Sequence, residues 1–121
     1  MEAAPHPLAS PLGRISISSD VVASIVGNTA AECYGVVGMS APSRVGRATR
    51  RLSRDRPTRG VVVRRENGGV AIELYVVVEY GLNLAEVAAT VRSRVGYEIE
   101  RLTGLSVSAV EVHIQDVRRS E

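Results

Sequence analysis

The sequence predicts an α+β protein, a two-layer sandwich in which two helices cover one face of a mostly antiparallel sheet. A β-hairpin is indicated by two β-rich runs, residues 60–66 and 70–80, joined through Asn67-Gly68, a dipeptide that tight hairpin turns favour. One segment before this hairpin and one after it carry apolar residues at helical spacing. Each of these helices needs an apolar sheet face to pack against, which gives the two layers.

One domain is expected to fill most of the chain. With 121 residues and a mass of 12.9 kDa, the sequence is long enough to bury a core without disulfides. We place the domain at residues 13–117, between a disordered N-terminal tail, residues 1–12, and a frayed C-terminus, residues 118–121. The only cysteine, Cys33, cannot form an intrachain disulfide, which favours a reducing compartment and hence the cytoplasm. No apolar window is long enough to span a membrane, so any membrane association is expected to be peripheral.

The first part of the domain is predicted to hold a strand, a helix and a short apolar segment. Residues 14–18 alternate isoleucine with polar residues, which is the period of a strand. Ser18 or Ser19 can cap the helix that follows, and Gly35 can end it. Residues 35–39 are too few for a helix and are expected to form a strand or a packed turn. The apolar face of the helix is assigned to Val22, Ile25, Val26, Thr29 and Cys33.

A short basic helical connector is predicted next, within SRVGRATRRLSRDRPTRG, residues 43–60. Ser43 can cap this helix and Pro57 ends it. Its only apolar stripe consists of Val45, Ala48 and Leu52. A helix of about ten residues is marginal in water by itself, so this stripe must dock on the domain or leave the segment loose.

The hairpin, a long helix and a last strand complete the order βαββαβ, with the second strand made by residues 60–66 and extended by residues 36–39. Asn83 and Glu86 give a start resembling a capping box, and Gly104 ends the long helix. The last strand is placed at residues 107–117. The core is assigned to Ile72, Leu74, Val76, Val78 and Tyr80 of the hairpin, Leu84, Val87, Ala88, Val91, Val95, Ile99 and Leu102 of the helix, and Val110, Val112 and Ile114 of the last strand. A mostly solvated outer sheet face is assigned to Ala71, Glu73, Tyr75, Val77 and Glu79.

Charge is distributed unevenly along the chain. Residues 44–65 carry nine arginines and one acid, whereas the rest has six arginines and twelve acids. A basic surface of this kind suits an anionic partner, either nucleic acid or an anionic membrane surface that it would contact weakly. Two features temper the nucleic-acid hypothesis: aromatic residues make up only 3% of the chain, and the complete absence of lysine is also what a GC-rich genome would produce. The candidate anionic-partner surface comprises Arg47, Arg50, Arg51, Arg54, Arg56, Arg59, Arg64 and Arg65.

Catalysis needs converging reactive groups, and the sequence offers few. Glu111 and His113 lie two residues apart on an outward strand face and could supply two ligands to a surface metal, but the next acid, Asp116, falls on the opposite face. Glu73 and Glu79 are roughly 20 Å apart along an extended strand, too far to act as a carboxylate pair. We therefore expect no catalytic, cofactor-binding or metal-binding residues, no small-molecule substrate and no enzyme activity.

The sequence resembles the alkaline-shock family of envelope stress response proteins, also called the Gls-type general-stress family. Four segments carry the likeness between Gly13 and about Val117: GRISIS, YGVVGM, RGVVVRRENGGVAIELYVVVEYGLNLAEVAATVRSRV and LTGLSVSAVEVHIQDV. The run VVVEYG, followed by a capped helix and then TGL, is specific in combination. The arginine-rich connector departs from the more mixed connectors expected of the family.

This resemblance implies a small, non-enzymatic cytoplasmic protein involved in cell-envelope homeostasis and stress resistance. It further implies that the protein forms a homo-oligomer and is brought close to the membrane by a membrane-anchor protein. A module that binds nucleic acid through residues 44–65 stays the alternative. The resemblance supplies no catalytic residues.

Overall fold

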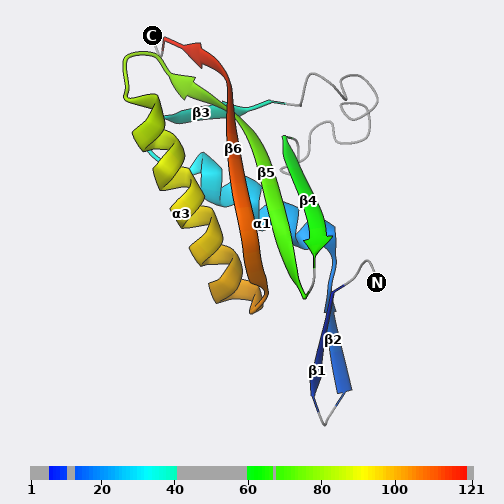
Figure 1. Cartoon of the computed structure of the whole chain (residues 1–121). Coiled ribbons are helices and arrows are strands. Elements are labelled where there is room, and N and C mark those ends of the chain that lie inside the picture. The colour runs from blue at the N-terminus through cyan, green and yellow to red at the C-terminus, as the bar shows by residue number, and fades with distance from the viewer. Residues whose placement is uncertain (1–5, 11–12, 41–59, 67, 120–121) are drawn as a thin grey trace.

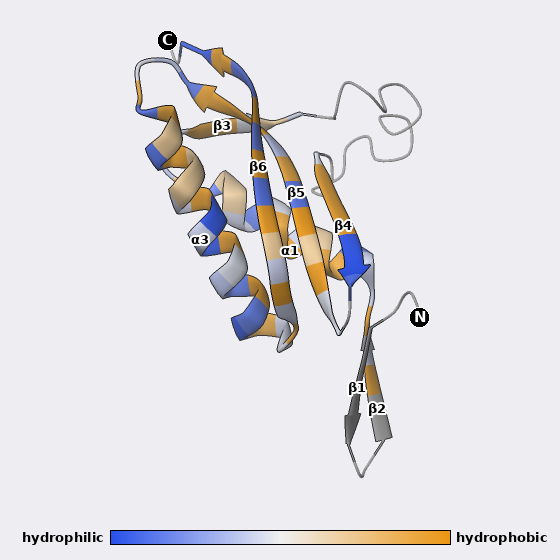
Figure 2. Cartoon of the chain, viewed as in Figure 1, coloured by the Kyte–Doolittle hydropathy of each residue, from blue (hydrophilic) through white to orange (hydrophobic). Residues whose placement is uncertain are grey.

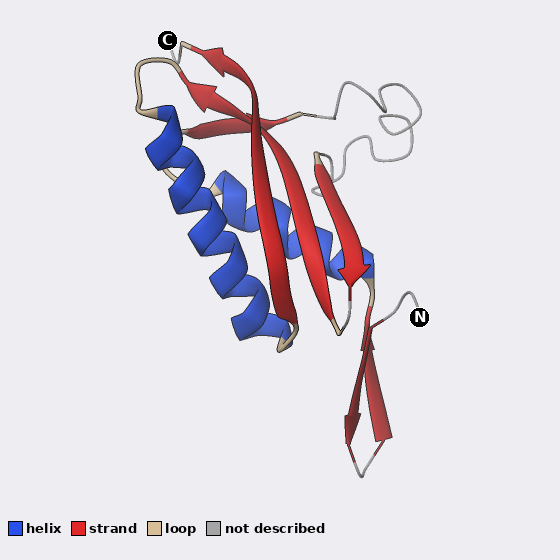
Figure 3. Cartoon of the chain, viewed as in Figure 1, coloured by secondary structure: helices blue, strands red, loops and turns tan. Residues whose placement is uncertain are grey.

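The computed structural model describes residues 6–10, 13–40, 60–66 and 68–119. Along the chain these form β1 (His6–Ser10), β2 (Gly13–Ile17), α1 (Ser19–Ala31), β3 (Val36–Met39), β4 (Val61–Glu66), β5 (Gly69–Glu79), α3 (Leu84–Thr103) and β6 (Ser106–Arg118). Two helices pack on one face of a four-stranded sheet (Figures 1 and 3). The predicted two-layer α+β class is confirmed.

β5 is the central strand of this sheet. On one edge it pairs with β6 in parallel, from Gly69 opposite Ser106 to Glu79 opposite Arg118. The orientation of β6 follows from the helix that precedes it, because a strand reached through a crossover helix can run parallel to its neighbour. On the other edge, β4 and β3 pair antiparallel with successive parts of β5. The sheet is therefore mostly antiparallel, as predicted. β3 continues the edge formed by β4, which was the role expected of residues 36–39.

β3 and β4 meet end to end at one residue of β5. The amide of Ser40 donates to the carbonyl of Tyr75 at 2.9 Å, and the amide of Tyr75 donates to the carbonyl of Gly60 at 2.9 Å. Gly60 has a φ of +81°, and a Cβ at this position would lie 2.8 Å from the carbonyl oxygen of Ser40. The chain thus leaves the sheet at Ser40 and re-enters it beside the same point. The predicted connector helix, residues 43–59, lies outside the described residues.

The core lies between the helices and the inner sheet face. α1 begins at the Ser18 cap, whose side chain accepts from the amide of Val21, and α3 begins at Asn83, whose side chain accepts from the amide of Glu86. Gly104 ends α3 with a φ of +78°. Hydrophobic and polar residues alternate along β5 and β6, and hydrophilic residues recur along α3 (Figure 2). The fully buried side chains include Val22, Val26, Val70, Ile72, Leu74, Val76, Val78, Val91, Val95 and Ile99.

The N-terminal region differs from the prediction. Residues 1–12 were expected to be disordered, but His6–Ser10 forms β1, which pairs antiparallel with β2. Together they form a separate two-stranded sheet that projects beyond the main one (Figure 1). The strand predicted at residues 14–18 is present, but it joins this hairpin. The hairpin is defined by backbone pairing between neighbouring segments, which composition alone does not reveal.

Some residues at the ends of predicted apolar stripes are exposed. Leu84 and Leu102, at the two ends of α3, are 40% and 54% exposed, and Tyr80 is 57% exposed at the end of β5. The α3 stripe instead ends on buried Thr103, whose hydroxyl donates to the carbonyl of Ile99. Periodicity gives the direction of a face but not the length over which the opposing layer covers it.

The outer sheet face is also less solvated than predicted. Ala71 and Val77 are only 1% and 2% exposed, although they alternate with the inward residues of β5. β5 has neighbouring strands on both sides, so short side chains along its outer face are shielded by the longer ones around them. The expected solvated face is therefore limited to its longer polar residues.

Candidate functional site

A polar cluster occupies the centre of the outer sheet face and draws on three strands. Glu73 and Tyr75 come from β5, and the β6 register places Glu111 opposite Glu73 and His113 opposite Tyr75. On the other side of β5, Arg64 of β4 pairs with Ala71, two residues from Glu73 and on the same face. Because paired residues in a sheet point to the same face, these five side chains gather on the side away from the helices.

Glu73 is held from two sides. Nη1 of Arg64 donates to Oε2 of Glu73 at 2.7 Å, and the hydroxyl of Tyr75 donates to Oε1 at 2.8 Å. These two hydrogen bonds, the one from Arg64 first, lower the pKa of the Glu73 carboxyl from its ordinary value. In return, the hydrogen bond to Glu73 raises the pKa of Arg64. Glu73 is therefore an anion fixed in position by its neighbours.

The imidazole of His113 lies flat against the ring of Tyr75. The ring centroids are 4.6 Å apart and the planes differ by 12°. Its Nε2 is 3.6 Å from Oε1 of Glu111, which is too long for a hydrogen bond. Among the described residues this nitrogen is shielded from solvent and has no hydrogen-bond partner. His113 and Glu111 thus form a close, loosely coupled pair on the strand at the edge of the sheet.

This cluster contains a set of groups that could ligate a metal. One atom each from Glu73, Glu111 and His113 lies within 4.8 Å of the others. The sequence pointed to Asp116 as the next acid; the structure brings in Glu73 instead, because β5 and β6 run in register. The guanidinium of Arg64 already neutralises Glu73, so a cation would have to compete with it.

The bulge in β6 corrects the expected position of Asp116. An irregularity between the partners of Val76 and Val77 leaves Gln115 as an extra residue, so Asp116 pairs with Val77 and shares the outer face. There Oδ2 of Asp116 lies 3.8 Å from Nε of Arg118. Simple alternation places it on the opposite face, and no feature of the sequence signals the bulge.

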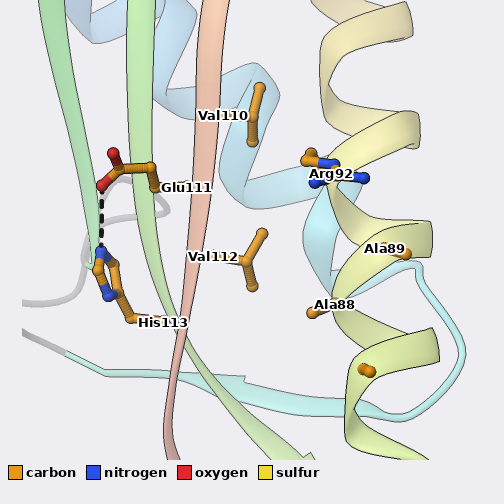
Figure 4. A pocket seen from close by; sticks show the side chains of 8 residues that line it. Ala88, Ala89, Arg92, Val110, Glu111, Val112 and His113 are labelled. Atoms are coloured by element: carbon orange, nitrogen blue, oxygen red, sulfur yellow. Dashed lines mark ion pairs between the residues drawn. The ribbon is translucent and has the colours of Figure 1, made fainter.

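A groove of about 520 Å³ runs between α3 and the outer edge of β6. Val110 and Val112 point from β6 toward α3, whereas Glu111 and His113 lie on the other side of the strand (Figure 4). Three alanines and one arginine of α3, within two turns of the helix, form the opposite wall. The lining residues are Ala85, Ala88, Ala89, Arg92, Val110, Glu111, Val112 and His113.

The two described members of the candidate anionic-partner surface lie on different faces of β4. Arg64 points outward to Glu73, whereas Arg65 pairs with Val70 and points to the helical side. Nη2 of Arg65 donates to the carbonyl of Ile17 at 2.8 Å, and its Nε and Nη1 are shielded with no hydrogen-bond partner in the described part of the chain. Burial lowers the pKa of Arg65. The other six arginines of the set, Arg47, Arg50, Arg51, Arg54, Arg56 and Arg59, lie outside the described residues.

Cys33 is buried, with 4% exposure, at the end of α1. Burial raises the pKa of its thiol, outweighing the opposing effect of Arg94. The thiol lies 3.5 Å from the carbonyl of Thr29, to which it donates. These surroundings fit the small buried residue expected from the sequence and disfavour a reactive thiolate.

The fold and the outer face together define a small two-layer α+β domain. Its outer sheet face carries a hydrogen-bonded polar cluster, and among the described strands β6 forms one edge of the sheet. The chain belongs to the alkaline-shock protein 23 family, described as having a cell envelope-related function, whose model matches residues 8–119. This confirms the resemblance to the alkaline-shock, Gls-type proteins. No helix in the described part of the chain is both long and apolar enough to cross a membrane.

Relatives of known sequence match over most of their length. The chain is 37% identical over 107 residues to YloU of Bacillus subtilis (strain 168), covering 88% of this chain and 89% of YloU. It is 35% identical to Spy1614 of Streptococcus pyogenes serotype M6, covering 88% of each. Among solved structures, the zinc form of MamM CTD D249N matches with a TM-score of 0.55 at 13% identity, over 80% of this chain and 84% of that one. At that identity the match shows a shared fold.

Proposed function

We propose that this protein is a non-enzymatic, self-associating scaffold of the envelope stress response that acts at the cytoplasmic face of the membrane, where a membrane-anchor protein holds it. The observation that carries the proposal is the match of the alkaline-shock family model, with its cell envelope-related function, across nearly the whole chain. The proposal goes further than this match in specifying self-association, location and partner.

The arrangement of polar groups supports an interaction role. The carboxylate of Glu73 is engaged by Arg64 and Tyr75, which fix it within the sheet face. The groove beside β6 is lined on the helix side mainly by alanines, and small side chains leave backbone and apolar surface within reach of another protein. A surface of this kind favours recognition of a protein segment over chemistry on a small molecule.

Crosslinking in the native cell tests the proposal. A tagged copy of the chain is crosslinked in intact cells, and its contacts are identified by mass spectrometry. We expect crosslinks from the tagged chain to a second copy of the chain and to a membrane protein. The crosslinked products should be recovered in the membrane fraction. Vesicles made from lipid extracted from the same cells, but without protein, should bind the purified chain weakly, because the anchor is a protein.

Two outcomes would contradict the proposal. The first is a strict monomer in light scattering across a range of concentration and salt. The second is an absence of membrane proteins among the crosslinked partners. A variant with Arg47, Arg50, Arg51 and Arg54 replaced by glutamine is the control for direct lipid attraction, and it should remain in the membrane fraction.

The alternative of nucleic-acid binding through the arginine-rich segment stays a prediction. It requires a steep loss of affinity with salt, with a log–log slope of about −0.9 for each phosphate neutralised on duplex DNA. The same four-arginine variant decides it: unchanged binding to DNA would exclude the segment as the binding surface. The intramolecular contacts of Arg64 and Arg65 leave these two residues less available to phosphates.

A further inference from the structure

We propose that the outer edge of β6 is the self-association surface, and that a second copy of this chain adds its own β6 there in antiparallel orientation. The two sheets would then form one continuous sheet around a twofold axis at Val112. This inference rests on the self-association proposed above and specifies its surface and register.

The first argument is the open edge. Among the described strands, β6 pairs with β5 only, over its whole length from Ser106 to Arg118. An edge strand presents unpaired amides and carbonyls that another strand can use. β4, the strand on the opposite edge, spans only Val61–Glu66. β6 is thus the longer template for pairing.

Two bulges limit where a second strand can pair regularly. The register between β5 and β6 shifts on either side of the stretch from Ala109 to Ile114. Ser108 and Gln115 are the extra residues at these shifts. Bulges bend and twist a strand, so regular pairing is confined to the stretch between them.

The apolar face restricts the register further. Val110, Val112 and Ile114 point toward the helices and pack against the core. A partner strand must present its own apolar residues to the same side, because a slip by one residue would turn them to the wet face. Registers centred on Glu111 or Val112 keep five residues of the regular stretch paired, Ala109–His113 or Val110–Ile114, whereas a register centred on His113 keeps only Val112–Ile114.

Charge selects among these registers. Centring on Glu111 places Glu111 directly opposite its own copy, and like charges directly opposite each other are destabilising. Centring on Val112 places each Glu111 opposite the partner's His113, and Val110 opposite the partner's Ile114. Of the two registers, this one avoids the like-charge pair and sets the imidazole of His113, which can donate a hydrogen bond, opposite a carboxylate.

The groove beside β6 accommodates the helices of such a dimer. A twofold axis perpendicular to the sheet keeps both helical layers on one side, so the two copies of α3 become neighbours across the junction. Ala85, Ala88 and Ala89 leave room for this approach. Arg92 is exposed, and its long side chain can extend from the groove into solvent.

A disulfide experiment reads the register directly. Two variants, Glu111→Cys carrying a size tag and His113→Cys without one, are mixed and oxidised gently. The structure predicts a mixed-size crosslinked dimer at least tenfold more abundant than either same-size dimer, because position 111 faces position 113 of the other copy. The mixed dimer also keeps one native Glu111–His113 pair. Wild-type protein, which has only buried Cys33, is the control.

Each outcome has a distinct meaning. Crosslinking of Glu111→Cys mainly to itself would overturn the register, as would crosslinking of His113→Cys mainly to itself. Multimers in light scattering without any of these crosslinks would overturn the β6 surface and leave self-association standing, with another face or another strand partner as its basis. A strict monomer would overturn both proposals.

Charge reversal supplies an independent test. His113→Glu should weaken self-association at least tenfold, because it places Glu111 opposite glutamate. The double variant Glu111→His with His113→Glu should restore association, since each pair is rebuilt with its members exchanged. Gln115→Glu adds the same charge at the bulge, outside the regularly paired stretch, and should have less than a twofold effect. Failure of the double variant to recover, with an intact fold by circular dichroism, would contradict the pairing.

Discussion

Gly60 shows how much of this fold depends on single backbone positions. Its positive φ is unfavourable for other residues, and a Cβ there would meet the backbone of Ser40. We predict that Gly60→Ala lowers the free energy of unfolding by about 1–3 kcal/mol in urea denaturation. Gly96→Ala is the matched control, because a Cβ there meets nothing within 4 Å and the site is helical. It should stabilise the protein by about 0.5–1 kcal/mol, and equal losses in both variants would contradict the structural argument.

The ion pair between Arg64 and Glu73 should make stability depend on pH in a defined direction. The pKa of Glu73 is lowered in the folded state, so its contribution is fully present above the unfolded pKa and is lost as pH falls through the folded pKa. We predict that Arg64→Gln destabilises the protein at pH 7, and that the difference from wild type shrinks as pH falls below about 4. Thermal unfolding across pH 2–7 measures this difference. A constant difference, or the same difference in a Glu73→Gln background, would contradict the assignment.

The sequence identifies the charged residues of the polar cluster on the outer sheet face, but it does not show which of them lie next to one another. Arg64 and Arg65 are adjacent cations in the sequence, yet β4 sends one to the outer face and one toward the helices. Glu73 and His113 are far apart in the chain and meet only because β5 and β6 pair in parallel. Side-chain alternation is a local property, whereas strand register is set by the whole sheet.

At the scale of elements, α3 offers a comparison between two apolar residues of the predicted stripe. Ile99 is fully buried, whereas Leu102, three residues later, is 54% exposed. We predict that Ile99→Ala costs about 2–5 kcal/mol and Leu102→Ala about 0.5 kcal/mol or less in urea denaturation. Similar costs for both would show that the end of α3 packs more tightly than the structure indicates.

Most elements could be predicted because their signals are local. The capping residue Asn83, the stop at Gly104 and the alternation in β5 each act within a few residues. Pairing between distant segments carries no such signal, so the sequence did not reveal β1, the bulges of β6 or the placement of β2 outside the main sheet. The groove beside β6 arises from the same long-range packing.

At the scale of the whole molecule, the sheet should fold without the arginine-rich segment. Ser40 and Gly60 both hydrogen-bond to Tyr75, so a short linker can join them. We predict that replacing residues 41–59 by a flexible linker of about four residues changes the free energy of unfolding by less than about 1 kcal/mol, since loop length has a weak effect on closure entropy. Urea denaturation and the amide NMR spectrum measure this. Loss of cooperative unfolding would show that the segment belongs to the core.

The shortened variant also separates the proposed functions. If the β6 edge joins two copies, the variant should self-associate like the wild type while losing any affinity for anionic partners that the arginines provide. Light scattering and binding to anionic vesicles measure the two properties side by side. Loss of self-association in a correctly folded variant would place the contact in residues 41–59.

The junction at Tyr75 has a consequence for how this protein can diversify. β3 ends and β4 begins beside the same residue of β5. The chain between them can therefore vary in length and sequence without changing the register of either strand. Substitutions within the inserted piece then leave the pairing of β3 and β4 with β5 unchanged. A segment inserted there can hold the seven arginines of residues 41–59 without any of them having to fit into the sheet.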